Sequence, residues 1–342
     1  MASRSSAKPK KRITINDIAA MAETSKTTVS FYLNGKTERM SEETKARIRD
    51  AIRDTGYEPS PLARGMNAKE SKLIGVIIGD ITNTFSNLIV KGIDRVASEA
   101  GYRMLVCNSN YDRANELAYI DRLLALGVDG FIVQPTAQFK EVSSAIADAG
   151  KQLVFIDSKL YDFTSSWVKT DNYEASRRAV ETCVAKGYRR FLVVTATPGL
   201  ISSRIERFSG FVDALEAAGL GFTQFLIEGD QVDVEAVRGF LRENIDGEEP
   251  TLVFAPNCWA LPDIYVACRD LYPLMPDRMG LLGFDNTEWA SVASPSVSVV
   301  VQPAECEGEQ AARILLDQIA GEGKIDPHQV LDCQVEWGAS TL

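Results

Sequence analysis

The chain contains 342 residues but a single histidine, His328, which follows a proline near the C-terminus. A Ser-His-Asp or Cys-His catalytic group needs its histidine beside the nucleophile, and no Gly-x-Ser-x-Gly motif precedes a helix-like segment. Neither a phosphate-binding loop nor a Gly-x-Gly-x-x-Gly motif follows the first strand-like run, and the sequence has no cluster with metal-ligand spacing. The sequence therefore argues against an enzyme, a cofactor and a bound metal, and the lone histidine is expected to be structural.

Paired cysteines and long apolar runs are missing as well. The six cysteines form no Cys-x-x-Cys pair, which indicates reduced thiols in a cytosolic protein rather than a disulfide framework or a zinc site. No apolar run approaches the ~20 residues that span a bilayer. The N-terminus, MASRSSAKPKKR, is basic but is followed by no apolar segment, so it is not a secretory signal. We expect a cytoplasmic protein that has no membrane partner.

Charge is distributed unevenly along the chain, whose formal net charge is −10. Residues 1–72 carry 15 Lys and Arg against 9 Asp and Glu, a net of +6, and the remainder carries 22 against 38, a net of −16. A basic head on an acidic body indicates that one end of the chain meets a polyanion such as nucleic acid. A solvated basic tail is the alternative that charge alone leaves open.

Residues 13–58 are predicted to form three short helices, after a basic tail at residues 1–12 that we expect to be disordered. Small polar residues and glycine stand where these helices should begin and end. The expected caps are Thr14 with Asp17, Ser25 and Ser41 at the starts, and Asn34-Gly35 and Gly56 at the ends. Two short helices joined by a tight turn and followed by a third match a helix-turn-helix.

The second helix of this head carries small polar residues on its exposed face, namely Lys26, Thr27, Thr28 and Ser30. Side chains of these types can reach base edges and phosphates in a major groove of DNA. A helical cap packed on the larger domain is the alternative, but it leaves the basic charge of the head unexplained. We therefore expect double-stranded DNA as a partner.

The stretch ITINDIAAMAETSKTTVSFYLNG, with MSEETKARIRDAIRDTGYEPSPLAR after it, resembles the DNA-binding head of the LacI/GalR family of bacterial transcription regulators. That family reads T-I-x-D-V-A-x-x-A-G-V-S-x-x-T-V-S-R-x-L-N, then V-S-x-x-T-R, then G-Y-x-P-N-x-x-A-R. The resemblance implies that Lys26 and Thr27 read bases. The DNA-contacting set that we predict is Thr14, Ser25, Lys26, Thr27, Thr28, Ser30, Phe31, Asn34, Tyr57, Leu62, Ala63, Arg64 and Met66.

Three positions of the head depart from the family pattern. Glu23 replaces the usual turn glycine, so the turn is expected to form with a residue that avoids positive φ. Phe31 stands where arginine is usual, which removes a base or phosphate contact, although a phenylalanine can contact a thymine methyl. Ser60 stands where asparagine usually follows the proline. The operator sequence is therefore not predicted.

Residues 59–71 are predicted to form a hinge helix or linker. Ser60 can cap a short helix and Pro61 can be its first residue, while Leu62 and Met66 share one side. A helix this short is marginal alone in water and needs a partner that covers its apolar side. The resemblance implies that two such helices pair in a dimer and enter the minor groove, with Met66 as the wedge between bases. A flexible linker is the alternative.

From Lys72 onward, strand-like and helix-like segments alternate. The strand-like segments are LIGVIIGD, YRMLVCN, DGFIVQP, QLVFID, RRFLVVTA, FLIEG, TLVFAP, MGLLGFD and VSVVVQ. Their alternation with amphipathic stretches is the signature of parallel, doubly wound sheets, and their number favours two subdomains with a cleft.

This region, residues 72–338, resembles the periplasmic-binding-protein-like body of the same family. The predicted fold is therefore a small all-α head plus an α/β two-lobed body. Crossovers near Asp171, Gln302 and Pro327 would divide the body. Lobe 1 would comprise 72–170 and 303–327, and lobe 2 would comprise 171–302 and 328–338.

Polar residues follow several of these strands, where ligands bind in open α/β sheets. The predicted effector site comprises Asp80, Asn83, Phe85, Gln134, Asp157, Arg207, Asn257, Asp285 and Trp289. Carboxylates, amides, an arginine and an aromatic face suit a sugar, although each residue alone also has a plainer role in a turn, a cap or the core. The resemblance implies ligand contacts for Asp157, Arg207, Asn257 and Asp285. Cys258 stands where aspartate is usual, so the Asn257 loop is expected to be reshaped.

These features together predict a ligand-responsive transcription regulator that acts as a repressor. We expect it to bind a palindromic operator in the nucleoid as a homodimer. A tetramer is the alternative assembly. The effector is expected to be a sugar, a sugar acid or a phosphosugar, because Arg207 could pair with a carboxylate. A purine or a phosphocarrier protein is the alternative regulator. An α/β enzyme, a solute-binding receptor and a ligand-independent architectural DNA binder are the less favoured functions.

Overall fold

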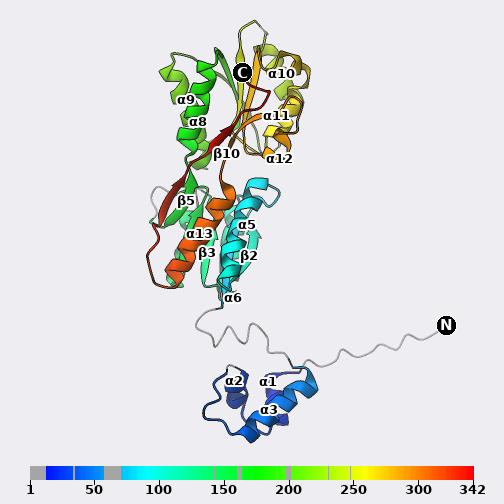
Figure 1. Cartoon of the computed structure of the whole chain (residues 1–342), viewed down its shortest axis with the longest axis vertical. Helices are drawn as coiled ribbons and strands as arrows, with labels where there is room; N and C mark the ends of the chain where they lie inside the picture. The colour runs from blue at the N-terminus through cyan, green and yellow to red at the C-terminus, as the bar shows by residue number, and fades with distance from the viewer. Residues whose placement is uncertain are drawn as a thin grey trace, which may run out of the picture. The chain divides into compact units, whose positions relative to one another are not determined.

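The computed structural model describes residues 13–33, 35–57, 71–136, 138–141, 143–159, 164–197, 202–229, 231–246 and 248–342 (Figure 1). The chain divides into two compact units, Met1–Ser71 and Lys72–Leu342. The predicted basic tail, the predicted helix end at Asn34 and the predicted hinge residues from Ser60 to Met66 lie outside the described residues. Within the described residues, no helix combines the length and apolar character needed to cross a membrane.

The head contains α1 (Ile15–Met21), α2 (Lys26–Leu33) and α3 (Glu42–Thr55). The predicted caps are confirmed at the start of each helix. The Thr14 hydroxyl accepts a hydrogen bond from the Asp17 amide, and the Asp17 carboxylate accepts one from the Thr14 amide, which completes a capping box. The Ser25 and Ser41 hydroxyls accept from the amides three residues later. These bonds satisfy N–H groups that have no partner inside the helix.

A small apolar core holds the three helices of the head together. Ile18, Ala22, Val29, Ile48 and Ala51 are buried in this cluster. They come from all three helices, so none of these helices buries its apolar side without the other two. With so few buried side chains, the head depends on its caps and turns for a larger share of its stability than a large domain does.

Lobe 1 of the body is built on a six-stranded parallel sheet with the order β11-β5-β4-β3-β1-β2. Its strands are β1 (Leu73–Ile78), β2 (Arg103–Asn108), β3 (Gly130–Val133), β4 (Gln152–Ile156), β5 (Ser166–Thr170) and β11 (His328–Leu331). Its helical segments are α5 (Thr84–Glu99), α6 (Arg113–Leu126), η1 (Phe139–Glu141), α7 (Ser144–Asp148) and α13 (Ala304–Ile319). Apolar clusters fill both faces of this sheet, as expected for parallel strands.

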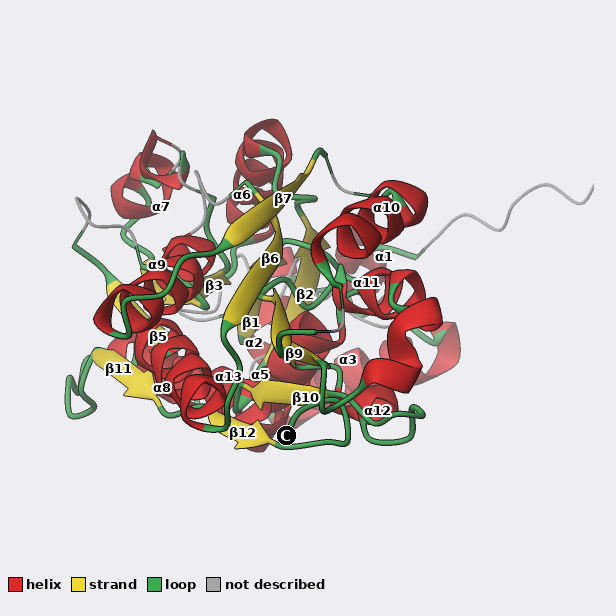
Figure 2. Ribbon diagram, turned by 90° about the horizontal axis from the view of Figure 1, so that it is seen from above, coloured by secondary structure: helices red, strands yellow, loops and turns green. Residues whose placement is uncertain are grey.

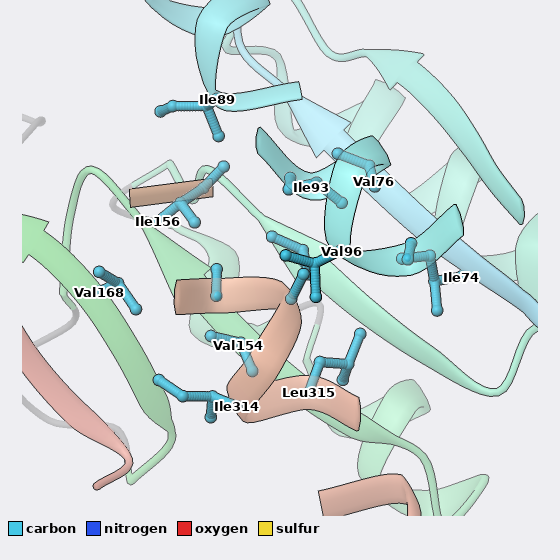
Figure 3. Packing of buried hydrophobic residues seen from close by; sticks show 14 of the residues in the cluster. Ile74, Val76, Ile89, Ile93, Val96, Val154, Ile156, Val168, Ile314 and Leu315 are labelled. Atoms are coloured by element: carbon cyan, nitrogen blue, oxygen red, sulfur yellow. The ribbon is translucent and has the colours of Figure 1, made fainter. Parts of the chain in front are cut away.

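Helix α13 comes from a distant part of the sequence and lies beside α5 on one face of this sheet (Figure 1). Figure 3 shows the side chains beneath them, among which Val76 of β1, Ile93 of α5 and Ile314 of α13 are fully or almost fully buried. Glycines set the close approach of the two helices. A Cβ atom added at Gly92 would lie 2.0 Å from the Glu305 carbonyl oxygen, and one at Gly308 would lie 2.0 Å from the Ile89 carbonyl oxygen.

Lobe 2 is built on a second six-stranded sheet with the order β12-β10-β9-β8-β6-β7, in which β12 is antiparallel to β10. Its strands are β6 (Arg190–Ala196), β7 (Thr223–Ile227), β8 (Thr251–Ala255), β9 (Met279–Phe284), β10 (Ser298–Val301) and β12 (Gln334–Glu336). Its helical segments are α8 (Asn172–Ala185), α9 (Ser202–Ala217), α10 (Val234–Asn244), α11 (Leu261–Ala267), η2 (Arg269–Leu274) and α12 (Thr287–Ala290). Helices α8 and α9 cover one face of the sheet, and α10 and α11 cover the other (Figure 2).

The chain passes between the lobes at Asp171, at Gln302 and between Leu331 and Cys333. The predicted third crossover near Pro327 is wrong, because residues 328–331 pair with β5 in lobe 1 before the chain leaves it. Strands β5, β11 and β12 were not predicted, since all three are short and lack a continuous apolar run. Lobe 2 also continues past residue 338: the Ser340 hydroxyl donates to the Leu281 carbonyl at 2.6 Å.

Candidate functional site

The predicted DNA-reading face of α2 is partly exposed in the head. Lys26 and Thr27 are exposed, Phe31 is 49% exposed, and Thr28 and Ser30 are half-buried. These side chains follow one another along a single helix. The exposed members therefore offer one cation, one hydroxyl and one aromatic ring to a groove of DNA.

The remaining head residues of the predicted DNA-contacting set have structural contacts in the head itself. The Thr14 hydroxyl is 2.7 Å from an Asp17 carboxylate oxygen, and the Ser25 hydroxyl is 2.8 Å from that of Thr28. Tyr57 packs against the head core. Any contact of Thr14 and Ser25 with a phosphate must therefore coexist with their capping bonds. Asn34, Leu62, Ala63, Arg64 and Met66 lie outside the described residues.

The turn between α1 and α2 contains a strained residue. Glu23 has φ of 47°, so the expectation that a glutamate here would avoid positive φ is wrong. The tight turn requires this conformation, because the Glu23 and Thr24 amides donate back to the Ala20 and Ala19 carbonyls. The Glu23 carboxylate also lies 3.3 Å from the Arg47 guanidinium of α3, in an exposed ion pair. The left-handed conformation costs a non-glycine residue about 1–2 kcal/mol.

In the body, both lobes contribute to a small cavity of about 40 Å³. Its lining is Asn83, Phe85, Tyr111, Gln134, Asp157, Ser203, Arg204, Arg207, Asn257, Cys258 and Trp259. An adjoining cleft of about 480 Å³ is lined by Gly79, Asp80, Asn83, Asn110, Tyr111, Arg204, Gly229 and Trp259. Seven of the nine predicted effector residues therefore line the cavity or the adjoining cleft.

On the lobe 1 side, hydrogen bonds hold Asp157 and Gln134 in place. The Gly79 amide donates to the Gln134 side-chain oxygen at 2.9 Å, and the Gln134 side-chain nitrogen donates to Asp157 Oδ2 at 2.9 Å. Asp157 Oδ1 is buried and makes no hydrogen bond within the part of the chain that the structure describes. A buried carboxylate oxygen that faces a cavity in this way is an acceptor for a ligand hydroxyl.

Tyr111 is a cavity residue that the sequence did not single out. Its ring lies so close to Gly79 that a Cβ atom there would be 2.3 Å from the ring, so only glycine fits. Burial raises the pKa of the Tyr111 phenol, and the charges of Asp157 and Cys258 raise it further, whereas Arg204 lowers it. The phenol therefore stays neutral and can both donate and accept a hydrogen bond.

On the lobe 2 side, Arg207 is fixed by its surroundings. Its Nε donates to the Asn172 side-chain oxygen at 2.7 Å, and its Nη1 donates to the Pro256 carbonyl at 2.9 Å. Its guanidinium carbon lies 4.1 Å from the centroid of the Phe284 ring, in cation–π geometry. Asn257 is fixed as well, because its side-chain oxygen accepts from the Thr195 hydroxyl and from the Ala196 amide.

Two predicted effector residues are not brought to the cavity. Asp285 instead binds the crossover residue Gln302, whose amide and side-chain nitrogen donate to its two oxygens at 3.0 and 2.7 Å. Trp289 packs against Tyr265 in the lobe 2 core, with ring centroids 5.5 Å apart. Trp259 lines the cavity together with two other aromatic side chains, Phe85 and Tyr111. The rule that ligands bind at strand ends could have found Trp259, since it follows β8 by four residues.

A buried acid, Glu307 of α13, contacts the backbone of the cavity residue Asp157. Its Oε1 accepts a hydrogen bond of 2.5 Å from the Asp157 amide, and its Oε2 has no partner among the described residues. Burial, together with the nearby Asp157, raises the pKa of the Glu307 carboxyl well above its ordinary value. Sequence reasoning missed this residue because it lies inside a helix, far from any strand end.

The cavity offers hydrogen-bonding groups but a poor nucleophile. Burial raises the pKa of the Cys258 thiol to about 11, with Asp285 acting in the same direction, so the reactive thiolate is scarce at neutral pH. His328 lies elsewhere, stacked on Trp167 in lobe 1 with ring centroids 5.2 Å apart. Among the described residues, no group of three or more His, Cys, Asp or Glu side chains is placed to hold a metal ion. The arrangement suits binding of a polyol by hydrogen bonds and by an aromatic face.

Comparisons with protein-family models match nearly the whole chain. Residues 14–60 match the model for bacterial regulatory proteins of the lacI family. Residues 71–259 match the model for periplasmic binding proteins and the sugar binding domain of the LacI family, and residues 180–341 match a periplasmic binding protein-like domain.

Curated proteins give the same family, and solved structures give the same fold. The HTH-type transcriptional regulator KdgR of Bacillus subtilis (strain 168) is 32% identical over 311 residues, which cover 90% of this chain and 92% of KdgR. PtxS of Pseudomonas aeruginosa, also an HTH-type transcriptional regulator, is 29% identical over 311 residues, which cover 91% and 90%. A transcriptional regulator CelR–cellobiose complex has a TM-score of 0.67 at 23% identity, covering 96% of this chain and 100% of that one. A LacI family regulator from Silicibacter pomeroyi has a TM-score of 0.79 at 20% identity, covering 96% and 99%.

Proposed function

The chain belongs to the LacI family of bacterial regulatory proteins, and from that premise we propose that it represses transcription by binding a palindromic operator as a homodimer, under the control of a carbohydrate-like effector. One observation carries this proposal: a cavity lined by polar side chains from both lobes belongs to the same chain as a helix-turn-helix head. The protein would act in the cytoplasm, at the nucleoid, and would not be an enzyme.

Several features of the head support DNA binding. Residues 1–72 carry a net charge of +6. Helix α2 exposes Lys26, Thr27 and Phe31. In a helix-turn-helix, the second helix lies in the major groove, and two-fold symmetry of a dimer matches a palindromic site. In the proposal, Lys26 and Thr27 read bases, Phe31 contacts a thymine methyl, and the hinge residues Leu62, Ala63, Arg64 and Met66 reach the minor groove.

The chemistry of the cavity supports a carbohydrate-like effector. The Asp157 carboxylate and the side-chain amides of Gln134 and Asn257 suit hydroxyl groups, and Trp259 offers an aromatic face. The complex with cellobiose reported for CelR shows a sugar bound to a protein of the same fold. A sugar, a sugar acid and a phosphosugar are all compatible with this polar lining. A protein co-regulator remains the second proposal for control of the same head.

Direct contacts between the lobes explain how a ligand could control the head. The Asn83 side-chain nitrogen of lobe 1 donates to the Cys258 sulfur of lobe 2 at 3.4 Å. Lys169 of β5 binds both carboxylate oxygens of Glu206 of α9, at 2.6 and 2.7 Å. A ligand held by both lobes would favour one relative orientation of them over another. Operator affinity would change only if the ligand binds the two orientations with different affinity.

The proposed DNA binding predicts a steep dependence on salt. An operator selected from random duplex DNA should lose about a thousandfold or more in affinity between roughly 50 and 200 mM salt, because bound phosphates release counterions. Fluorescence anisotropy with labelled DNA measures this loss. Lys26→Ala should weaken binding and flatten the salt slope, whereas Arg53→Ala, on the exposed face of α3, should change neither. A salt-independent affinity would contradict the proposal.

A further inference from the structure

The two arginines that line the effector cavity have different surroundings. Arg207 is held by Asn172, by the Pro256 carbonyl and by the Phe284 ring, so two of its three nitrogens are already bonded. Arg204, one turn earlier on α9, lines both the small cavity and the adjoining cleft. Within the described residues it makes no hydrogen bond and no ion pair. Arg207 is therefore part of the frame of the site, whereas Arg204 is available to a ligand.

Among the described residues, no carboxylate forms an ion pair with the Arg204 guanidinium. Burial is the main influence on Arg204 and lowers its pKa, while Tyr111 and Asp157 act in the opposite direction. An arginine nevertheless stays charged in a protein, and a partly buried charge is stabilised when an ionic partner replaces the water that it has lost. The unpaired donors of Arg204 therefore point to a site that an anion would complete.

Each of the two nearby carboxylates already has one oxygen engaged elsewhere. Asp157 Oδ2 accepts from Gln134, and Asp80 Oδ1 accepts from the amide and the hydroxyl of Thr82, in a local turn. Neither acid forms an ion pair with Arg204 in the described part of the chain. The described residues thus supply no anionic partner for this arginine, so its donors are open to an anionic ligand.

The N-terminus of helix α9 adds a positive electrostatic potential, which has the same sign as the charge of Arg204. The helix begins at Ser202, so Ser203 and Arg204 of its first turn both line the cavity. Amides in the first turn of a helix have no partner inside the helix and carry the positive end of its dipole. An anion beside Arg204 would meet both the guanidinium and this field.

We propose that the effector is a sugar acid whose carboxylate binds Arg204, which lines both the small cavity and the adjoining cleft. Its hydroxyl groups then lie toward Asp157, Gln134 and Asn257. A single guanidinium matches a single carboxylate, to which it can donate two parallel hydrogen bonds. A doubly charged phosphate would be poorly matched, because Asp80 and Asp157 also line these two spaces. The inference rests on the proposed function and specifies the ligand class of that same site.

Paired probes test this ligand class directly. D-Gluconate, D-glucuronate and D-galacturonate are each titrated beside the corresponding amide, which keeps the hydroxyl groups and removes the charge, and D-glucose 6-phosphate is included. Calorimetry on the full chain should show at least one acid that binds about tenfold or more tightly than its amide. Arg204→Met should remove that preference and leave the affinity for the amide within about twofold. Arg204→Lys should restore part of it.

Arg122→Met is the matched control, because Arg122 is an exposed arginine of α6 that lines neither the cavity nor the adjoining cleft. This variant should bind the acid and the amide with the affinities of the wild type. Unliganded melting temperatures should be equal for the Arg204 variants and the wild type, because Arg204 has no hydrogen bond or ion pair to lose among the described residues. The inference is wrong if no acid binds more tightly than its amide, if the phosphate binds better than every acid, or if Arg204→Met weakens acid and amide equally.

Failure of this inference can be separated from failure of the proposed function. If a neutral sugar binds and changes operator affinity while no acid does, the proposed regulatory function is supported and the proposed sugar-acid ligand is contradicted. If an acid binds through Arg204 and leaves operator affinity unchanged at saturation, the proposed ligand class is supported and its role as an effector is contradicted. Anisotropy with labelled operator, run at saturating concentration of each bound probe, distinguishes the two.

Discussion

In the head, the side chains that begin each helix are bonded to residues three positions away, as Thr14, Ser25 and Ser41 are. In the body, the groups around the cavity are joined across 23 residues between Gln134 and Asp157, and across 150 residues between Asp157 and Glu307. The head is therefore specified by local chemistry and stays largely intact when a distant residue changes. The cavity depends on the whole body, which is what a site that senses a ligand through lobe movement needs.

The largest expected effect is on the body. Arg207→Met should lower the free energy of unfolding of the body by about 3 kcal/mol, because it leaves the Asn172 and Pro256 oxygens without donors and the buried acids without a cation. Urea unfolding followed by tryptophan fluorescence measures this, since all four tryptophans lie in the body. Arg122→Met is the control and should unfold like the wild type. An unchanged midpoint for Arg207→Met would show that the network around Arg207 is not structural.

A smaller effect should appear in the pH dependence of body stability. The folded-state pKa of Glu307 is raised by burial and by Asp157, so the contribution of this group is fully present below the ordinary carboxyl value of 4.5 and is lost as the pH rises through the folded value. Glu307→Gln should therefore remove part of the decline in stability between about pH 5 and pH 8. The readout is the urea midpoint at a series of pH values.

Glu305→Gln is the matched control for this experiment. It removes an exposed acid from the same helix, whose pKa is lowered chiefly by its hydrogen bond to Lys91, so it should not change the slope above pH 5. The charged groups that face Glu307 are unchanged in both variants, so they do not affect the comparison; these groups are Asp157, Asp285 and Arg207. Equal slopes for wild type and Glu307→Gln would contradict the raised pKa of the buried Glu307 carboxyl.

The smallest effect is expected in the head, and with the opposite sign. Glu23→Gly should raise the stability of the head by at most about 1 kcal/mol, because glycine relieves the positive φ while it loses chain entropy and the Arg47 ion pair. Helical circular dichroism of the head transition measures the change. Glu38→Gly, at an exposed position without positive φ, should be neutral or destabilising. Destabilisation by Glu23→Gly would mean that the ion pair outweighs the backbone strain.

The sequence predicted the local features of the protein best. The caps at Thr14, Ser25 and Ser41 could be predicted from the sequence because each depends on residues within one helical turn. The apolar strands of both sheets could be read because burial on two faces leaves a continuous run. Edge strands such as β11 were missed, since half of their side chains face solvent and their pairing partner is about 160 residues away.

The lining of the proposed effector site was predicted only in part. Strand-end position found Gln134, Asp157 and Asn257, because parallel strands end at the same edge of a sheet. It also selected Asp285, whose left-handed turn directs the carboxylate to Gln302 instead of the cavity. Glu307 and Arg204 could not be found in this way, because helices bring them to the site through packing between distant segments.

The most direct test of the account is the coupling between the two regions. Operator affinity is measured by anisotropy for the wild type and for Asp157→Asn, with and without each compound that raises the melting temperature of the body. The account predicts that a bound effector changes the wild-type dissociation constant by about fivefold or more. Asp157→Asn should keep the ligand-free operator affinity and lose the change. A wild-type protein that is saturated with such a compound and binds its operator with unchanged affinity would contradict the account.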